Sequence, residues 1–129
     1  MLKTKTQSTA YTLVTDKDMT YSYAETKTGA TWVDGKPIYR RVFKVANKSL
    51  SNGTMVQSFA RSNFSEITRI YAYLCGSDGG HIPFTRVGSG GKGSSIEYSS
   101  ANKGFIFMGN DTWSAQSSRW LMIIAEYTK

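Results

Sequence analysis

Short apolar runs separated by turn residues constrain the fold of this chain more than any other feature. Runs such as IYRRVFKV (38–45) and WLMIIAEYT (120–128) are rich in β-branched and aromatic residues, which favour strands. Glycine, asparagine and aspartate, which reverse a chain, stand between the runs, and no long stretch has a helical period. The pattern predicts an all-β chain, a single β-sandwich or jelly-roll-like domain of about eight or nine short strands.

The length and composition are those of one globular domain, with 129 residues of which 40% are hydrophobic. Residues 1–18 are polar and threonine-rich, and we expect a flexible or extended arm there, with the sandwich domain over residues 19–129. The alternating segment MTYSYAET (19–26) is expected to be extended. The first residues lack the apolar core of a signal peptide, and no window approaches 18 apolar residues, so membrane insertion is not expected.

A hairpin is predicted where the sequence reads TWVDGKPIYRRVF (31–43). Trp32 and Val33 end one strand, and the next begins at Ile38 and Tyr39. Asp34 and Gly35 provide the two positive-φ positions of the turn. Pro37 lacks an N–H and therefore belongs at the start of the second strand or on an edge.

Adjacent arginines in the second strand of this hairpin must point to opposite sides, because side chains alternate along a strand. Arg40 shares a face with Ile38 and Val42, while Arg41 shares the other face with Tyr39 and Phe43. Each face carries charge, so the alternation does not assign the buried one.

Three further segments carry specific expectations. Ser62 or Asn63 is expected to cap a short helical turn, followed by a strand over residues 67–74. Two glycine-rich turns flank a short strand predicted from Ile82 to Val87. The closing run is predicted to be a central strand covered on both faces, with Leu121, Ile123 and Ala125 on one side and Trp120, Met122 and Ile124 on the other.

The net charge of +7 comes from 16 basic and 9 acidic residues. A positive field attracts polyanions, such as nucleic acid, anionic lipid or an anionic cell-wall polymer, and is equally consistent with a role in solubility alone. Nucleic-acid binding would interleave aromatic and basic residues along one face. Only YRRVFK (39–44) fits that pattern, so nucleic acid is not an expected partner.

Groups that carry out catalysis are scarce. His81 is the single histidine and is interpreted as a loop residue, and Cys75 is the single cysteine, interpreted as a buried, inert thiol. Asp16 and Asp18 are spaced like the start of a calcium loop but lack the remaining ligands. The glycine-rich stretch RVGSGGKGSS (86–95) departs from a phosphate-binding loop in its glycine spacing and in the residue after its lysine. We therefore expect no enzyme, no cofactor and no metal site.

A binding role is favoured by the polar, aromatic stretch GNDTWSAQSSRW (109–120). A flat indole stacks on sugar rings, and neighbouring amide, carboxylate and guanidinium groups bind hydroxyls. An alternative is that the indole folds back and caps the core. The candidate ligand-binding residues are Trp113, Asn110, Asp111, Gln116 and Arg119.

The stretch TGATWVDGKPIYRRVF (28–43) resembles the TGxxWxDGKPIYR signature of the carboxy-terminal domains of bacteriophage tail and fibre proteins. The ending WLMIIAEYTK (120–129) is similar to the closing strand of that domain, and the resemblance covers about residues 22 to 129. The motif residues are Trp32, Asp34, Gly35, Lys36, Pro37, Tyr39 and Arg40.

The resemblance implies a virion surface protein, made in the host cytoplasm and assembled into a tail or capsid fibre. It implies a homotrimer that contacts other virion proteins and binds a host-surface receptor, in particular a polysaccharide. The alternative is a purely structural decoration or fibre-assembly protein without a receptor. In either case the motif is expected to be a hairpin that fixes the sandwich, with Tyr39 and one arginine fastening it to its neighbours.

Overall fold

The computed structural model describes residues 21–46, 48–76, 79–84, 86–87, 91–110 and 119–129. Within them the chain forms nine strands and one short 3-10 helix. They are β1 (Thr26–Thr31), β2 (Pro37–Ala46), β3 (Met55–Ser58), η1 (Arg61–Asn63), β4 (Ile67–Gly76), β5 (His81–Pro83), β6 (Arg86–Val87), β7 (Gly93–Ser99), β8 (Gly104–Gly109) and β9 (Arg119–Tyr127).

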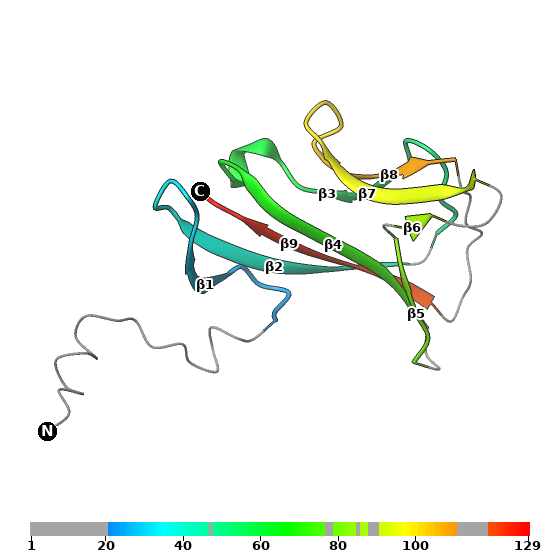
Figure 1. Cartoon of the computed structure of the whole chain (residues 1–129), viewed down its shortest axis with the longest axis horizontal. Coiled ribbons are helices and arrows are strands. Elements are labelled where there is room, and N and C mark those ends of the chain that lie inside the picture. The colour runs from blue at the N-terminus through cyan, green and yellow to red at the C-terminus, as the bar shows by residue number, and fades with distance from the viewer. Residues whose placement is uncertain (1–20, 47, 77–78, 85, 88–90, 111–118) are drawn as a thin grey trace, which may run out of the picture.

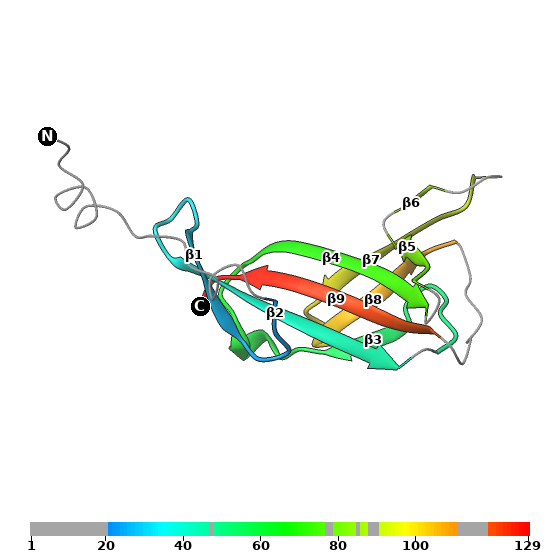
Figure 2. The ribbon, with the colours of Figure 1, turned by 90° about the horizontal axis from the view of Figure 1, so that it is seen from below.

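The strands form two antiparallel sheets packed face to face (Figure 1). One sheet has the order β1-β2-β9-β4-β5, and the other has the order β3-β8-β7-β6. Figure 2 looks onto the five-stranded sheet from below, with β9 between β2 and β4 and the second sheet behind. The predicted all-β sandwich is confirmed.

Aromatic rings dominate the interior between the sheets. The ring of Phe59 lies 5.2 Å from those of Phe64 and Tyr127 and 5.8 Å from that of Phe105, measured between centroids. Such offset and tilted contacts add to the energy of burying the rings. The side chains with no exposed surface include Phe84, Phe105, Phe107, Ile123 and Tyr127.

The closing run forms the centre of the larger sheet, as predicted, but the expectation that both of its faces are covered is wrong, because Met122 and Ile124 are only half-buried. β9 pairs with β2 from Tyr127 to Trp120 and with β4 over its whole length. Leu121, Ile123 and Ala125 are buried between the sheets. Phe43 and Val45 of β2 are on the same side, which settles the buried face of that strand.

The hairpin that joins β1 to β2 forms where the motif predicts it. Gly35 has a φ of +84° and its N–H donates to the carbonyl of Trp32, while the N–H of Trp32 donates to the carbonyl of Lys36, both over 2.9 Å. Only Gly35 of the expected Asp34–Gly35 pair has a positive φ, so this detail of the prediction is wrong. β1 ends at Thr31, just before the indole, and Pro37 begins β2 as expected.

This hairpin turn also reaches across the sheet. The indole N–H of Trp32 donates to Glu66 (3.2 Å) and the ammonium of Lys36 donates to the hydroxyl of Ser65 (3.2 Å). Because β9 lies between β2 and β4, both bonds cross the end of β9, where Thr128 has no exposed surface. We call Trp32, Lys36, Ser65 and Glu66 the hairpin clamp. Figure 1 shows the C-terminus beside the hairpin tip.

Three sequence expectations are corrected. The single strand predicted from Ile82 to Val87 is two strands, β5 in the larger sheet and β6 in the smaller one, because the chain crosses between the layers at this point. Residues 21–25 contain no strand. The helical turn is η1, but its N-cap is Ala60 and no side chain caps it, so the capping role given to Ser62 or Asn63 is wrong.

Candidate ligand-binding face of the five-stranded sheet

The face of the larger sheet that points away from the second sheet, the outer face, carries ordered rows of side chains. Residues directly opposite one another in neighbouring strands share a face. Lys44, Met122 and Tyr73 form one row across β2, β9 and β4. Val42, Ile124 and Tyr71 form the adjacent row. In Figure 2 no other strand lies over this part of the sheet.

A hollow of about 640 Å³ lies over these rows, and we call it the outer groove. Its volume is within the range of small-ligand sites. Aliphatic and aromatic side chains form its floor and walls, and one serine adds a hydroxyl to those of the tyrosines. The lining residues are Tyr21, Ser22, Tyr23, Val42, Tyr73, Met122 and Ile124.

One wall of the outer groove is the segment 21–25, which five contacts hold in place. The Val42 N–H donates to the carbonyl of Ser22 (2.9 Å), and the Arg41 guanidinium donates to the carbonyl of Tyr23 (3.1 Å). The Arg40 guanidinium lies 4.4 Å from the centroid of the Tyr21 ring. Glu25 accepts hydrogen bonds from Tyr127 and Lys129, both over 2.7 Å.

These contacts lie on both sides of the sheet. Tyr127 faces the core, whereas Arg40 is on the outer face, so segment 21–25 crosses the open edge of β2. Partial burial opposes ionisation of Glu25, but the bonds from Lys129 and Tyr127 outweigh it and lower the pKa of the carboxyl below its ordinary 4.5. Burial, and then the bond to Glu25, raise the pKa of the Tyr127 phenol. The wall is therefore anchored by a charge-assisted network.

Tyr73, which lines the outer groove from β4, belongs to an aromatic cluster. The ring centroids of Tyr73 and His81 are 4.5 Å apart, and those of Tyr71 and Tyr73 are 5.6 Å apart. The Tyr71 hydroxyl is 3.1 Å from the His81 Nε2. Burial, followed by the nearby Cys75 and Tyr71, raises the pKa of Tyr73, so this ring presents a neutral hydroxyl.

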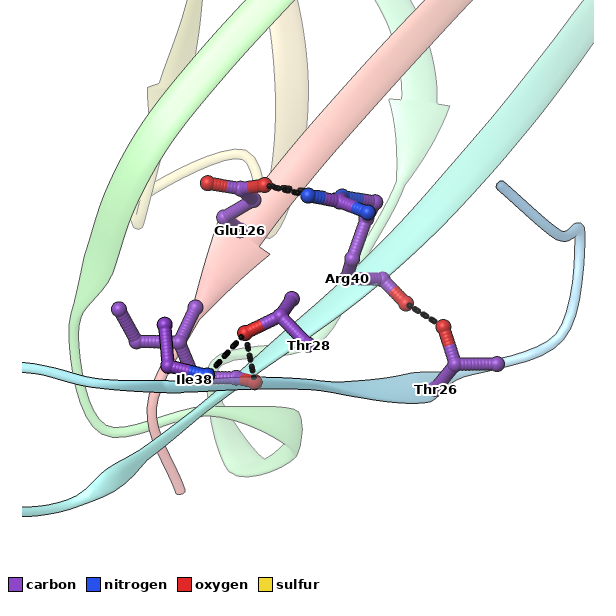
Figure 3. Close-up of polar contacts among 6 residues, drawn as sticks. Thr26, Thr28, Ile38, Arg40 and Glu126 are labelled. Atoms are coloured by element: carbon purple, nitrogen blue, oxygen red, sulfur yellow. Dashed lines mark hydrogen bonds and ion pairs between the residues drawn. The ribbon is translucent and has the colours of Figure 1, made fainter. Parts of the chain in front are cut away.

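An ion pair borders the apolar rows at one end. The Arg40 guanidinium contacts the Glu126 carboxylate over 2.8 Å, and both side chains are 15% exposed (Figure 3). Figure 3 also shows Thr26 and Thr28 donating to the carbonyls of Arg40 and Ile38, which holds the irregular strand β1 against β2. Tyr39 stacks on Tyr127 with 6.4 Å between the ring centroids, so Tyr39 and Arg40 both contact residues of β9.

A second hollow of about 340 Å³ adjoins the outer groove at the edge of β2, and we call it the edge hollow. Both hollows are lined by Tyr23 and Val42. The edge hollow adds two cations, Arg41 and Lys44, and the amide of Gln57. The Lys44 ammonium also lies 4.7 Å from the centroid of the Trp120 ring.

Of the ligand-binding residues predicted from the sequence, the structure describes Asn110 and Arg119. Asp111, Trp113 and Gln116 lie outside the described residues. Asn110 accepts from the Gly93 N–H (2.8 Å) and donates to the Gly91 carbonyl (3.1 Å), so its amide holds two loops together. Arg119 begins β9, opposite Gly76.

Two residues that the sequence analysis singled out, the single histidine and the single cysteine, lie in other surroundings than expected. His81 begins β5 rather than lying in a loop, and Cys75 is half-buried rather than buried. In the described part of the chain no three His, Cys, Asp or Glu side chains are placed to hold a metal ion. Asp16 and Asp18 lie outside the described residues. Within those residues no helix is long and apolar enough to cross a membrane.

The tyrosines of the outer groove were not among the predicted site residues. The alternation of Tyr21 with Tyr23 and of Tyr71 with Tyr73 is present in the sequence. The alternation shows that the two tyrosines of each pair lie on the same side of the chain. It does not predict that Tyr23 lies close to Tyr73. Their approach depends on β9 lying between β2 and β4 and on the path of segment 21–25.

Comparison with known proteins returned no match among protein-family models, curated proteins or solved structures.

Proposed function

We propose that this chain is a surface module of a bacteriophage virion that attaches the particle to a polysaccharide of the host cell, without catalysing a reaction. The observation that carries the proposal is the outer groove, where tyrosine rings and aliphatic side chains form the floor and walls. Ring faces of this kind stack on sugar rings, while the hydroxyls of Ser22 and Tyr73 bind sugar hydroxyls.

The WVDGKPIYR motif supports the virion assignment through its resemblance to phage tail and fibre domains. In this role the chain forms a homotrimer in a tail or capsid fibre, in contact with other virion proteins. Weak sugar contacts repeated in three copies give high avidity without new contacts. The hairpin clamp keeps the end of the closing strand in place and takes no part in binding.

A purely structural virion protein is the second candidate, and one observation favours it. Met122 and Ile124 of β9 are only half-buried on the outer face, and apolar side chains in this position are suited to packing against a symmetry mate. In that case the outer groove would be filled by protein in the particle. Measuring the mass of the Tyr73→Ala variant in solution separates the two candidates. The structural candidate predicts that this variant dissociates the assembly, and the binding candidate predicts that it does not.

The test is binding of the purified chain to host cells and to isolated wall polysaccharide. Tyr73→Ala is expected to weaken binding about tenfold, which corresponds to the loss of one ring contact. Val33→Ala is the control, because Val33 is 90% exposed at the hairpin tip and lines neither hollow. Unchanged binding by Tyr73→Ala would contradict the proposed site, and loss on Trp113→Ala alone would move it to residues 109–120. Antibody labelling of virions in electron micrographs tests the location.

A further inference from the structure

The outer groove and the edge hollow adjoin each other but differ in charge. The outer groove is lined by rings, aliphatic side chains and the hydroxyl of Ser22. The edge hollow contains the Arg41 guanidinium and the Lys44 ammonium. Because Tyr23 and Val42 belong to both, a chain-like ligand lying along the groove meets two cations where it crosses the edge of β2.

The carboxylates near these hollows already have partners. Glu126 binds Arg40, and Glu25 binds Lys129 and Tyr127. The ion pairs found among the described residues include neither Arg41 nor Lys44. Arg41 donates its Nε to the Tyr23 carbonyl, and its guanidinium lies 4.6 Å from the centroid of the Phe43 ring. Its positive charge also helps to lower the pKa of Glu25, with which it forms none of these ion pairs. The Lys44 ammonium rests on the ring of Trp120.

We infer that the polysaccharide bound by this chain is an acidic one, whose sugar rings occupy the outer groove while its carboxylate groups bind Arg41 and Lys44 in the edge hollow. The inference rests on the proposed function and names the class of glycan. A charge-assisted hydrogen bond from these cations to a carboxylate is stronger than one to a neutral hydroxyl. Arg69, which pairs with Glu126 across β4 and β9, adds to the positive field of the same face.

Nucleic acid is a different kind of polyanion, and the arrangement favours it less. A single strand needs a cationic track along a row of aromatic platforms. Here the cations gather at one edge, and aliphatic side chains of Val42, Met122 and Ile124 form much of the groove. Uronic acid polymers instead carry one carboxylate on each sugar ring. Their sugar rings can stack on the tyrosines of the outer groove while a carboxylate reaches the cations of the edge hollow.

The experiment compares two probes that differ only in charge, oligogalacturonate and its methyl ester of the same length. Calorimetry at low salt is expected to show the acid form binding at least about tenfold more tightly, with affinity that falls as salt is added. Equal affinity for both forms would overturn the acidic class and leave the proposed glycan binding intact. Tighter binding of single-stranded DNA of matched charge would also overturn it.

Variants locate the contact. Lys44→Gln is expected to weaken binding of the acid form about fivefold and to leave binding of the ester unchanged. Arg41→Gln is expected to weaken binding of the acid form by at least as much and binding of the ester by less, because Arg41 also holds the Tyr23 carbonyl in the groove wall. Lys103→Gln is the matched control, because it removes the same charge from the turn between β7 and β8 of the other sheet. Equal losses in all three would mean that only the overall field acts, which would overturn the site.

Folding and self-association are controlled separately. Tyr23→Ala, at a ring that is 58% exposed and lines both hollows, is expected to reduce binding of both probes while the thermal midpoint stays within a few degrees. If neither probe binds and Tyr73→Ala breaks an oligomer, the outer face is a contact between copies. The acidic-glycan inference and the proposed function then fail together.

Discussion

The two sides of β9 present similar apolar side chains to different surroundings. Leu121, Ile123 and Ala125 face the second sheet and are at most 2% exposed. Met122 and Ile124 face the other way, stay half-buried and form the floor of the outer groove. Both faces of β9 are therefore apolar enough to pack into a core, and the position of the second sheet decides which one does.

The outer face of the smaller sheet is unlike that of the larger one. Ser95 and Glu97 are on the outside of β7, where the Ser95 hydroxyl donates to the Glu97 carboxylate over 3.1 Å. Ile106 and Met108 lie opposite them on β8, so this face mixes apolar side chains with polar ones. The outer face of the larger sheet differs because it holds a hollow lined by tyrosines, methionine and isoleucine, with cations at its edge, which is why we assign binding to it.

The largest expected effect compares neighbouring isoleucines on β9. Ile123→Ala is expected to cost about 3 kcal/mol of unfolding free energy, because it leaves a cavity in a side that is fully buried. Ile124→Ala is expected to cost about 1 kcal/mol, since only part of its surface is buried. Urea unfolding at several protein concentrations measures both. Equal losses that depend on concentration would show that the outer face is covered by another copy.

The hairpin clamp gives the next effect. Trp32→Ala removes the bond to Glu66 and the indole that crosses the end of β9, and it is expected to cost about 1–2 kcal/mol. Val33→Ala, one residue along and 90% exposed, should change stability by less than about 0.5 kcal/mol. Thermal unfolding of the pair measures the difference. A loss in both variants would mean that the turn backbone, rather than the indole, holds the clamp.

The ion pair between Arg40 and Glu126 has a smaller expected effect. Its side chains are each 15% exposed, so a double-mutant cycle with Arg40→Met and Glu126→Gln should give a coupling of about 1 kcal/mol. A coupling near zero would mean that the ion pair positions the two side chains without stabilising the folded chain.

The pH dependence of the wall segment is the subtlest test. The pKa of Glu25 is lower in the folded chain than its ordinary 4.5, so its stabilising effect is complete above pH 4.5. This effect is lost as the pH falls through the lowered folded pKa. Glu25→Gln should therefore flatten the stability profile in this acidic window, and Lys129→Met should do the same by removing the main partner. A native profile in both variants would show that the network does not anchor residues 21–25.

Local chemistry was enough to predict many individual elements. The turn containing Gly35 reverses the chain as expected, because glycine reaches positive φ at little cost, with a value of +84°. The opposed directions of Arg40 and Arg41 follow from strand alternation alone. One strand was predicted over residues 82–87 and two formed, because a sequence run does not show where a chain passes from one layer to the other.

The candidate site was the least predictable part. The site residues predicted from the sequence are aromatic and polar neighbours along the chain. The outer groove is instead lined by residues from distant segments, namely 21–23, 42, 73, 122 and 124. Their proximity depends on strand order, and strand order is not encoded in any single run.

The class of fold, the places where the chain turns and the side chains that share a side of each strand can all be predicted from the amino-acid order, because they follow from backbone sterics and a two-residue period. The side that became core and the residues that meet across strands depend on how the two sheets pack. These outcomes depend on non-local pairing, whose energy comes from burying apolar surface between segments far apart in the chain.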